Sequence, residues 1–389
     1  GNMAMFAWGD EMVFLAPGVP AKGYKTFTVQ ESQAAAADES LTVEKQRMEN
    51  RFFRLELNEK GQFTSIYDKR AHREVLPEGQ CGNVFMSYED RPHNWDAWDI
   101  NMYYTEKSWE IGDGAEITVI EKGPVRVGLR IRHKYLNSDI EQRVYLYADL
   151  PRIDLEHDIH WEEEHILLKL LFPTDIHANE ATFDIQYGNV KRYTHANTSW
   201  DAAKFEVCMH KWMDVSEEGY GLSILNDCKY GCNVREGVIG LTLLKSATSP
   251  NPEADKEDHS FTFSLYPHKG GWREAGTVAQ AYYLNNPLQT VVKKTEGGIL
   301  AKEFSFVTCQ EPNVVVEAVK KAEKGNGIIV RLYECCDRRT KAELRFGLPL
   351  RSAAVCNMLE EEAQPLAFEK DTMKLSFRPY EIKTLLLEF

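Results

Sequence analysis

Apolar and polar residues alternate along much of the chain with a period of two. Val127, Leu129 and Ile131 alternate with polar or small neighbours, which predicts a strand with one buried face. The same pattern recurs at residues 53–57, 153–161, 261–265 and 328–332. Turn-forming residues follow the first of these and lead into a second predicted strand that runs to Tyr67. The periodicity therefore indicates a protein built mainly of β-strands.

Helical periodicity is scarce. Its best example, residues 315–322, is short and rich in β-branched residues, so we do not expect a helix there. A long surface loop is expected at residues 245–260, which are rich in Ser, Pro, Asp and Glu. Further breaks at residues 33–40 and 293–298 divide the chain of this all-β protein. The segments predicted from these breaks are residues 1–40, 41–295 and 296–389.

The composition of the chain mainly excludes two classes of protein, those that bind nucleic acid and those that span a membrane. The 389 residues include 46 Lys and Arg against 60 Asp and Glu, a formal net charge of −14. An acidic balance argues against a nucleic-acid partner, because binding to phosphates needs a basic surface. No apolar run approaches the roughly 18 residues that would span a bilayer, so we expect no membrane span. Gly1 reads as the remnant of a cleaved expression tag, and we expect the chain to be part of a longer protein.

The chain contains eight cysteines and no CxxC pair. Disulfide frameworks belong to short secreted chains, so we interpret these cysteines as buried free thiols of a reducing compartment and expect a cytoplasmic protein. A zinc site at Cys228 and Cys232 is disfavoured because no second ligand pair has matching spacing.

The densest cluster of aromatic and acidic residues lies at residues 89–99, where a proline forbids regular strand pairing and predicts a loop. Trp95 and Trp98 offer flat apolar faces, and Asp96 and Asp99 offer acceptors for hydroxyl groups. A carbohydrate pocket needs this combination, because sugar rings present C–H faces and a fringe of hydroxyls. An equally good interpretation is a structural loop whose tryptophans cover the sandwich edge while the aspartates cap backbone amides.

A second polar cluster follows an apolar strand, where Asp227, Lys229 and Tyr230 enter a turn that ends at a glycine. Polar groups at the end of a strand form either a binding rim or an ordinary hairpin turn, and both interpretations remain open. The three residues are therefore candidates for contact with a ligand, together with those of the loop at residues 95–99.

His157, His160 and Glu162 at first suggest a metal site. Strand alternation places His157 and His160 on opposite faces of the sheet, which argues against a shared metal ion. We therefore expect a charged outer face and one packed histidine.

No glycine-rich phosphate loop, GxSxG elbow or HExxH motif is present. Longer motifs occur instead, in a fixed order over roughly residues 40–389. They are Asp90-Arg91-Pro92, Trp95-Asp96-Ala97-Trp98-Asp99-Ile100, His210-Lys211-Trp212-Met213-Asp214, Gly219-Tyr220-Gly221, Leu225-Asn226-Asp227-Cys228-Lys229-Tyr230-Gly231, Leu244-Lys245-Ser246-Ala247-Thr248-Ser249-Pro250, Leu265-Tyr266-Pro267-His268, Pro312-Asn313-Val314, Arg331-Leu332-Tyr333-Glu334 and Pro379-Tyr380-Glu381-Ile382-Lys383-Thr384. This series resembles the C-terminal half of the class II α-mannosidases (glycoside hydrolase family 38), in particular their cytosolic and vacuolar branch.

The resemblance implies a galactose-mutarotase-like supersandwich at residues 41–295, flanked by a remnant of a small β domain at residues 1–40 and a small β-sandwich at residues 296–389. It also implies that the aspartate nucleophile and a divalent metal, zinc, belong to an N-terminal α/β domain of the parent enzyme. We find no counterpart of that domain's His-x-Asp motif here. We therefore assign no catalytic and no metal-binding residue to this chain, and expect it to be inactive alone.

The implied function is to support that N-terminal domain in hydrolysing terminal α-mannosides. Its expected partners are the mannoside substrate, the N-terminal domain and, in a homo-oligomer, further copies of the chain. The candidate residues of the substrate rim are Trp95, Asp96, Trp98, Asp99, Asp227, Lys229 and Tyr230. Two alternatives stay open: an autonomous carbohydrate-binding module built on the two loop tryptophans, and an aldose-epimerase-like enzyme that uses a His/Glu pair, for which His157 and His160 with Glu162 are the candidates.

Overall fold

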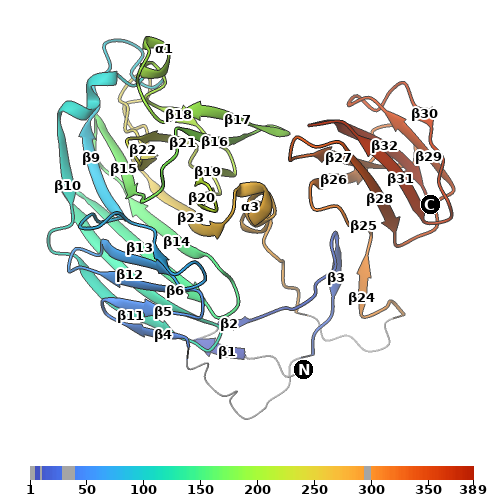
Figure 1. Ribbon diagram of the computed structural model, residues 1–389, viewed down its shortest axis with the longest axis horizontal. Coiled ribbons are helices and arrows are strands. Elements are labelled where there is room, and N and C mark those ends of the chain that lie inside the picture. The colour runs from blue at the N-terminus through green and yellow to red at the C-terminus, as the bar shows by residue number, and fades with distance from the viewer. Residues whose placement is uncertain (1–4, 9–10, 29–39, 293–298) are drawn as a thin grey trace. The chain divides into compact units, whose positions relative to one another are not determined.

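The structure is a computed structural model (Figure 1) that describes residues 5–8, 11–28, 40–292 and 299–389. The chain folds as two compact units, and strands dominate both, which confirms the all-β prediction. The large unit comprises residues 1–15, 34–185 and 190–287, and the small unit comprises residues 16–33, 186–189 and 288–389. The three segments expected from the sequence stay a prediction, because the breaks at residues 33–39 and 293–298 lie outside the described residues.

A nine-stranded sheet forms one layer of the large unit. Its strands, in spatial order, are β11 (Glu116–Lys122), β12 (Arg126–Tyr135), β13 (Ser138–Tyr147), β14 (Ile153–His160), β23 (Asp258–Lys269), β20 (Tyr220–Asn226), β19 (Trp212–Glu217), β16 (Glu180–Ile185) and β17 (Gly188–Tyr193). Alternation decides which residues face inward: Leu129 and Ile131 of β12 are fully buried, whereas the intervening arginine is not.

Two further sheets complete the large unit. The six-stranded sheet contains, in spatial order, β10 (Ser108–Ile111), β9 (Val84–Glu89), β15 (Ile166–Pro173), β22 (Val238–Leu244), β21 (Gly231–Arg235) and β18 (Val207–Cys208). The five-stranded sheet contains β4 (Thr42–Glu44), β5 (Arg47–Glu49), β6 (Phe53–Leu57), β7 (Phe63–Asp68) and β8 (Arg73–Glu74). One apolar cluster, with Phe53, Leu129 and Leu170 among its fully buried members, joins the three sheets into a supersandwich.

The core of the supersandwich also contains a chain of polar side chains. Gln142 and Asn83 exchange two amide hydrogen bonds, with Nδ2–Oε1 and Nε2–Oδ1 distances of 2.7 and 2.8 Å. The Gln142 amide also lies 2.9 Å from Nε2 of His157, whose ring stacks on Phe261 at 4.8 Å between centroids. Burial lowers the pKa of His157 to about 3 and that of His133 to about 4, so both imidazoles are neutral at pH 7.

The small unit is a second sandwich with its own core. A three-stranded sheet contains β25 (Val307–Cys309), β28 (Thr340–Phe346) and β31 (Thr372–Phe377). A five-stranded sheet contains β26 (Val314–Lys321), β27 (Ile328–Glu334), β32 (Ile382–Glu388), β29 (Ser352–Cys356) and β30 (Gln364–Pro365). Val330, Leu344 and Leu385 are fully buried between them. β3 (Gly23–Lys25) pairs with β24 (Glu303–Ser305); in the large unit, β1 (Met5–Trp8) pairs antiparallel with β2 (Glu11–Phe14).

Three short α-helices among the described residues and one strand boundary differ from the sequence-based expectation. The helices are α1 (Ser199–Ala202), α2 (Trp272–Ala275) and α3 (Thr277–Asn285). The predicted loop at residues 245–260 is wrong at its end, because β23 begins at Asp258, and wrong in part about exposure, because Ser246 and Ala247 are buried. The longest helix, α3, has nine residues, and no helix in the described ranges is long and apolar enough to cross a membrane.

Candidate functional site

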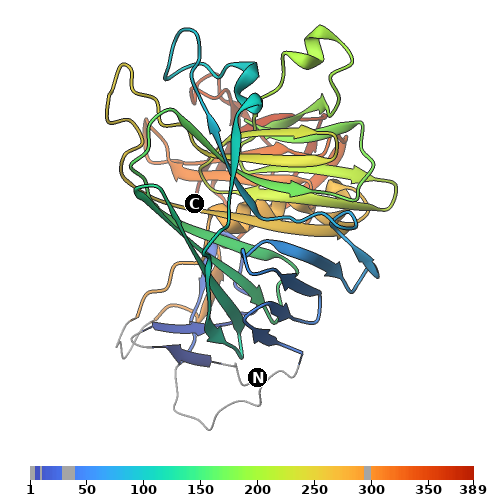
Figure 2. The same cartoon turned by 90° about the vertical axis from the view of Figure 1, so that its left-hand side faces the viewer.

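Both predicted clusters lie at the same end of the strands of the six-stranded sheet, which we call its loop edge. Glu89, the last residue of β9, pairs with Ile166 at the start of β15, and Leu168 pairs with Leu244 at the end of β22. Because β21 runs antiparallel to β22, its first residue, Gly231, lies at this edge too. In Figure 2 the segment after β9, in teal, and the segment after β22, in yellow, both lie at the upper left. Strand spacing places β9 and β21 about 14 Å apart.

We call residues 90–99, 165, 227–230 and 245–249 the sheet-end cluster. Two of its exposed members are tryptophans: the side chains of Trp95 and Trp98 are 71% and 72% exposed. Trp95 has a positive φ of 62°, which is costly for a bulky residue, and its carbonyl accepts the amides of Trp98 and Asp99 at 2.7 and 2.9 Å. The tight turn therefore holds two large apolar rings in solvent, against the usual hydrophobic preference.

Asp96 ties this loop to the segment after β22. Its Oδ2 accepts the backbone amides of Thr248 and Ser249 at 2.7 and 3.1 Å, and the Thr248 hydroxyl at 3.2 Å. Burial acts to raise the pKa of the Asp96 carboxyl, but these hydrogen bonds outweigh it and the pKa is lowered. Asp96 therefore holds the loop in place, whereas Asp99 is exposed and its carboxylate accepts the next amide, that of Ile100, at 3.0 Å.

A buried ion pair forms the base of the loop. Asp90 is 1% exposed and pairs through Oδ2 with the ammonium of Lys245, while its Oδ1 has no hydrogen-bond partner among the residues that the structure describes. Burial raises the pKa of the Asp90 carboxyl, and Lys245 offsets only part of that rise. The amide of Asp90 donates to the His165 carbonyl at 2.7 Å, and His165 Nδ1 lies 3.6 Å from Asp96 Oδ1. Residues far apart in sequence thus meet at the base of the loop.

The loop is also anchored on its C-terminal side. Tyr104, in the 3-10 helix η1 (Met102–Glu106), donates its hydroxyl to Glu206 at 2.7 Å. Glu206 is ion-paired with Lys169 of β15, which is 1% exposed. Burial, followed by the Glu206 carboxylate, raises the pKa of Tyr104. Sequence reasoning missed this network and the Asp90–Lys245 pair, although Asp90 and Lys245 both occur in the motifs that carry the family resemblance.

The predicted turn at the other end of the edge is compact. Asn226 Oδ1 accepts the Cys228 and Lys229 amides at 3.2 and 2.9 Å, an arrangement typical of a side-chain-capped turn. Asp227 accepts the amide of Thr262 at 2.9 Å, and so holds the turn against β23. The ammonium of Lys229 lies 5.1 Å from the ring centroid of Phe261.

Tyr230 is the exposed ring of this turn. Its side chain is 45% exposed, and the ring stacks on His210, a residue that was not among the candidates, at 5.0 Å between centroids. The structure therefore brings Trp95, Trp98 and Tyr230 to one edge as exposed rings, whereas Asp96 and Asp227 bond the backbone.

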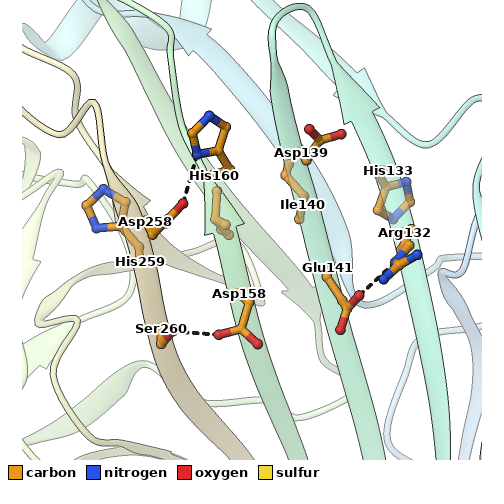
Figure 3. A pocket seen from close by; sticks show the side chains of 11 residues that line it. Arg132, His133, Asp139, Ile140, Glu141, Asp158, His160, Asp258, His259 and Ser260 are labelled. Carbon is orange, nitrogen blue, oxygen red and sulfur yellow. Dashed lines mark hydrogen bonds and ion pairs between the residues drawn. The ribbon is translucent and has the colours of Figure 1, made fainter.

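The two histidines of β14 point to opposite faces of the nine-stranded sheet, as alternation predicts. His157 lies in the core, whereas His160 lines an open pocket of about 560 Å³ on the outer face (Figure 3). His160 Nδ1 lies 2.8 Å from Asp258 and its Nε2 lies 3.3 Å from Glu162; the hydrogen bond to Asp258 raises its pKa. His160 and Glu162 therefore belong to a solvated charged face.

Metal ligands and disulfides do not contribute to these sites. Within residues 5–8, 11–28, 40–292 and 299–389, no three His, Cys, Asp or Glu side chains gather as a metal would require. All eight cysteines are free thiols, but the expectation that they are buried is wrong in part, because Cys208 and Cys228 are exposed. Cys232 is buried, and burial raises the pKa of its thiol.

Comparison with known proteins gives two family matches and several relatives. Residues 48–253 match the model of the glycosyl hydrolases family 38 C-terminal domain, and residues 313–385 match that of the family 38 C-terminal β-sandwich domain. Human alpha-mannosidase 2C1 is 37% identical over 93% of this chain and 34% of its own length. Alpha-mannosidase G of Dictyostelium discoideum is 35% identical over 87% of this chain and 32% of its own length. The chain thus spans about a third of the length of these curated relatives.

A solved structure supports the fold. The crystal structure of a protein in the glycosyl hydrolase family 38 from Enterococcus faecalis superposes with a TM-score of 0.80 at 19% identity, over 100% of this chain and 50% of that one. A similarity at this level of identity concerns the architecture alone, and it extends over both units.

Proposed function

Because the chain belongs to glycosyl hydrolase family 38, we propose that it forms the C-terminal, β-rich third of an α-mannosidase that hydrolyses terminal α-mannosides. The observation that carries the proposal is the ordered pair of family matches, at residues 48–253 and 313–385. The share of the relatives that the chain spans, about a third, supports the same assignment. Catalytic residues and the divalent metal, zinc, then belong to an N-terminal partner domain of the same polypeptide.

Within this enzyme, the sheet-end cluster would line the mouth of the substrate cleft. The exposed rings of Trp95, Trp98 and Tyr230 offer apolar faces to sugar rings, and the Asp99 carboxylate offers an acceptor to hydroxyls. The separation of about 14 Å between β9 and β21 suits an oligosaccharide better than a single sugar. The cluster would act by positioning: it would orient the glycan for hydrolysis, which raises the reaction rate, and would take no part in breaking the glycosidic bond. The eight free thiols support a cytosolic location for the enzyme.

The chain alone is expected to show no α-mannosidase activity. The reason is that the described residues contain no metal cluster and the proposed nucleophile belongs to another domain. The measurement is release of aryl alcohol from an aryl α-mannoside, with zinc, cobalt and manganese each added, and a complete family 38 α-mannosidase as the positive control. Metal-dependent hydrolysis by the purified chain would contradict the proposed division of labour.

In the complete enzyme, Trp98→Ala is expected to lower kcat/KM roughly fivefold, because one ring–sugar contact contributes about 1 kcal/mol. Asp99→Ala should also lower kcat/KM, by more than any loss of folded protein accounts for. The melting temperature should stay within about 2 °C of the parent value, because both side chains are exposed. Kinetics on a mannoside and a thermal melt of the same preparations make the comparison.

The matched control is Trp200→Ala in α1, where the indole is 80% exposed and lies outside the sheet-end cluster. It should leave both quantities unchanged. If the Trp98 and Asp99 variants lose activity only in proportion to stability, the loop is structural and the proposed rim is wrong.

A further inference from the structure

A second pocket lies on the face of the nine-stranded sheet that points away from the core. Its volume is about 580 Å³, and side chains of β16, β17, β19 and α2 line it. We propose that this pocket is a second carbohydrate-binding site, which takes one or two units of a neutral glycan. Pockets of this volume hold small organic ligands. The proposal goes beyond the substrate rim, because none of the sheet-end residues lines this pocket.

Two aromatic side chains form walls of the pocket. Trp272 packs on Trp212 with 4.8 Å between ring centroids, and the Arg273 guanidinium lies 4.1 Å from the Trp272 ring. Tyr193 is 55% exposed, and its ring stacks on His195 at 4.9 Å with an angle of 20°. Neighbours hold both rings in place, but Trp272 is only 5% exposed, so the exposed Tyr193 ring is the surface that a sugar would cover. An exposed flat ring whose orientation is set before a ligand arrives suits the C–H face of a sugar.

The floor of the pocket is a buried polar network. Asp214 is 2% exposed; its Oδ1 accepts the Ser216 hydroxyl at 2.5 Å, and its Oδ2 accepts the Ser223 hydroxyl at 2.8 Å and lies 2.8 Å from His268 Nε2. The Ser223 hydroxyl also lies 2.8 Å from that of Thr277 in α3. A network with this many satisfied bonds is rigid.

The network also sets the polarity of the floor. Ser216 gives its only hydroxyl proton to Asp214, so towards a ligand its oxygen acts as an acceptor for an O–H group. In the neighbouring strand β20, Gly221 leaves room for this network. A Cβ at Gly221 would lie 2.3 Å from Ser216 Oγ and 2.5 Å from His268 Cε1, so a larger residue would displace the groups that meet Asp214.

The charges around the pocket favour an uncharged ligand. Glu180 and Lys191 pair with each other at 2.9 Å at its edge, and the buried Asp214 carboxylate is satisfied by its own hydrogen bonds. The lining thus carries both signs, and its exposed polar groups include the amide of Asn179. Hydroxyl, amide and carboxylate groups next to aromatic rings match a polyhydroxylated neutral ligand better than an anion or a lipid.

The test is ligand binding to the chain itself, by calorimetry and by saturation-transfer NMR with methyl α-D-mannopyranoside and α-linked mannobioses as probes. We expect millimolar binding that Tyr193→Ala and Asn179→Ala each weaken at least fivefold. Tyr283→Ala, which removes a ring that is 63% exposed on α3 outside the pocket, should leave the affinity unchanged. Thermal melts confirm that each variant is folded; both substituted pocket residues are exposed, so folding should be retained.

Trp98→Ala distinguishes this site from the substrate rim. Loss of binding in Trp98→Ala with full binding in Tyr193→Ala would overturn the proposal, as would the absence of binding to any probe at 50 mM. Because the readout is affinity and not hydrolysis, failure here leaves the proposed α-mannosidase function intact, and failure of the activity tests leaves this site intact.

Discussion

Lys169→Met is expected to destabilise the large unit by about 3–5 kcal/mol, the range measured when one partner of a buried ion pair is removed. Lys169 is 1% exposed and pairs with Glu206. Glu206 also accepts hydrogen bonds from Tyr104 at 2.7 Å, from Asn233 at 2.8 Å and from Thr242 at 3.1 Å. Without the ammonium, these neutral donors remain around a buried carboxylate whose charge is no longer compensated. Urea unfolding followed by tryptophan fluorescence measures the loss.

Two comparisons make this result specific. Lys134→Met in β12 removes an ion pair with Asp139 in which both side chains are at least 60% exposed, and should cost less than about 1 kcal/mol. The double variant Lys169→Met/Glu206→Leu should regain most of the stability lost by Lys169→Met, because it removes both charges at once. Equal losses in Lys169→Met and Lys134→Met would show that the buried pair contributes no more than a surface pair.

Acid is expected to destabilise the large unit by about 4 kcal/mol between pH 8 and pH 5, from two histidines alone. Burial lowers the pKa of His133 to about 4 and that of His157 to about 3. In the unfolded chain both take up a proton near pH 6.5. Below that pH the unfolded state therefore binds more protons than the folded state. The free energy of unfolding is at its full value above pH 6.5 and decreases progressively as the pH falls towards 4. Each histidine contributes about 2 kcal/mol at pH 5.

Thermal or urea unfolding at pH 5, 6, 7 and 8 measures this slope. The variant His133→Leu should remove about half of this slope, because it removes one of the two titrating rings. Leucine suits the site because Phe85, whose ring centroid lies 5.4 Å from that of His133, already provides an apolar contact. His160→Gln is the control, because His160 is exposed on the other face and its pKa is raised. A slope that is unchanged in His133→Leu would contradict the assignment of acid sensitivity to the buried ring.

Alternation identified strands wherever one face of a sheet is buried and the other is wet. It placed β6, β12 and β14 correctly, and it also separated His157 from His160, because a period of two leaves no freedom in which face a residue occupies. The helices α2 and α3 escaped detection. They are short, and Gly276, with a φ of 71°, ends the first and caps the second, so no helical period develops over 272–285.

The candidate site was predictable only in part, because a sequence shows local composition but not which distant strands pair. The density of rings and carboxylates marked Trp95 and Trp98, and local composition is visible in a single sequence. The role of Asp96 was not, because its partner Thr248 lies 152 residues further along the chain. Asp90 and Lys245, 155 residues apart, meet only because β9 and β22 flank the same strand, β15. Such pairings depend on strand order, which motif spacing does not contain.

The position of β23 in the nine-stranded sheet bears on how the protein is synthesised. This strand of 12 residues lies between β14 and β20, yet it follows both in the chain. While residues 258–269 are still inside the ribosome, the emerging chain presents two half-sheets, each with an unpaired edge that can join another nascent chain. Completing the sheet is thus a late, non-local step. The family match that ends at residue 253 stops short of the joining strand, so a fragment for expression should extend at least through Lys269.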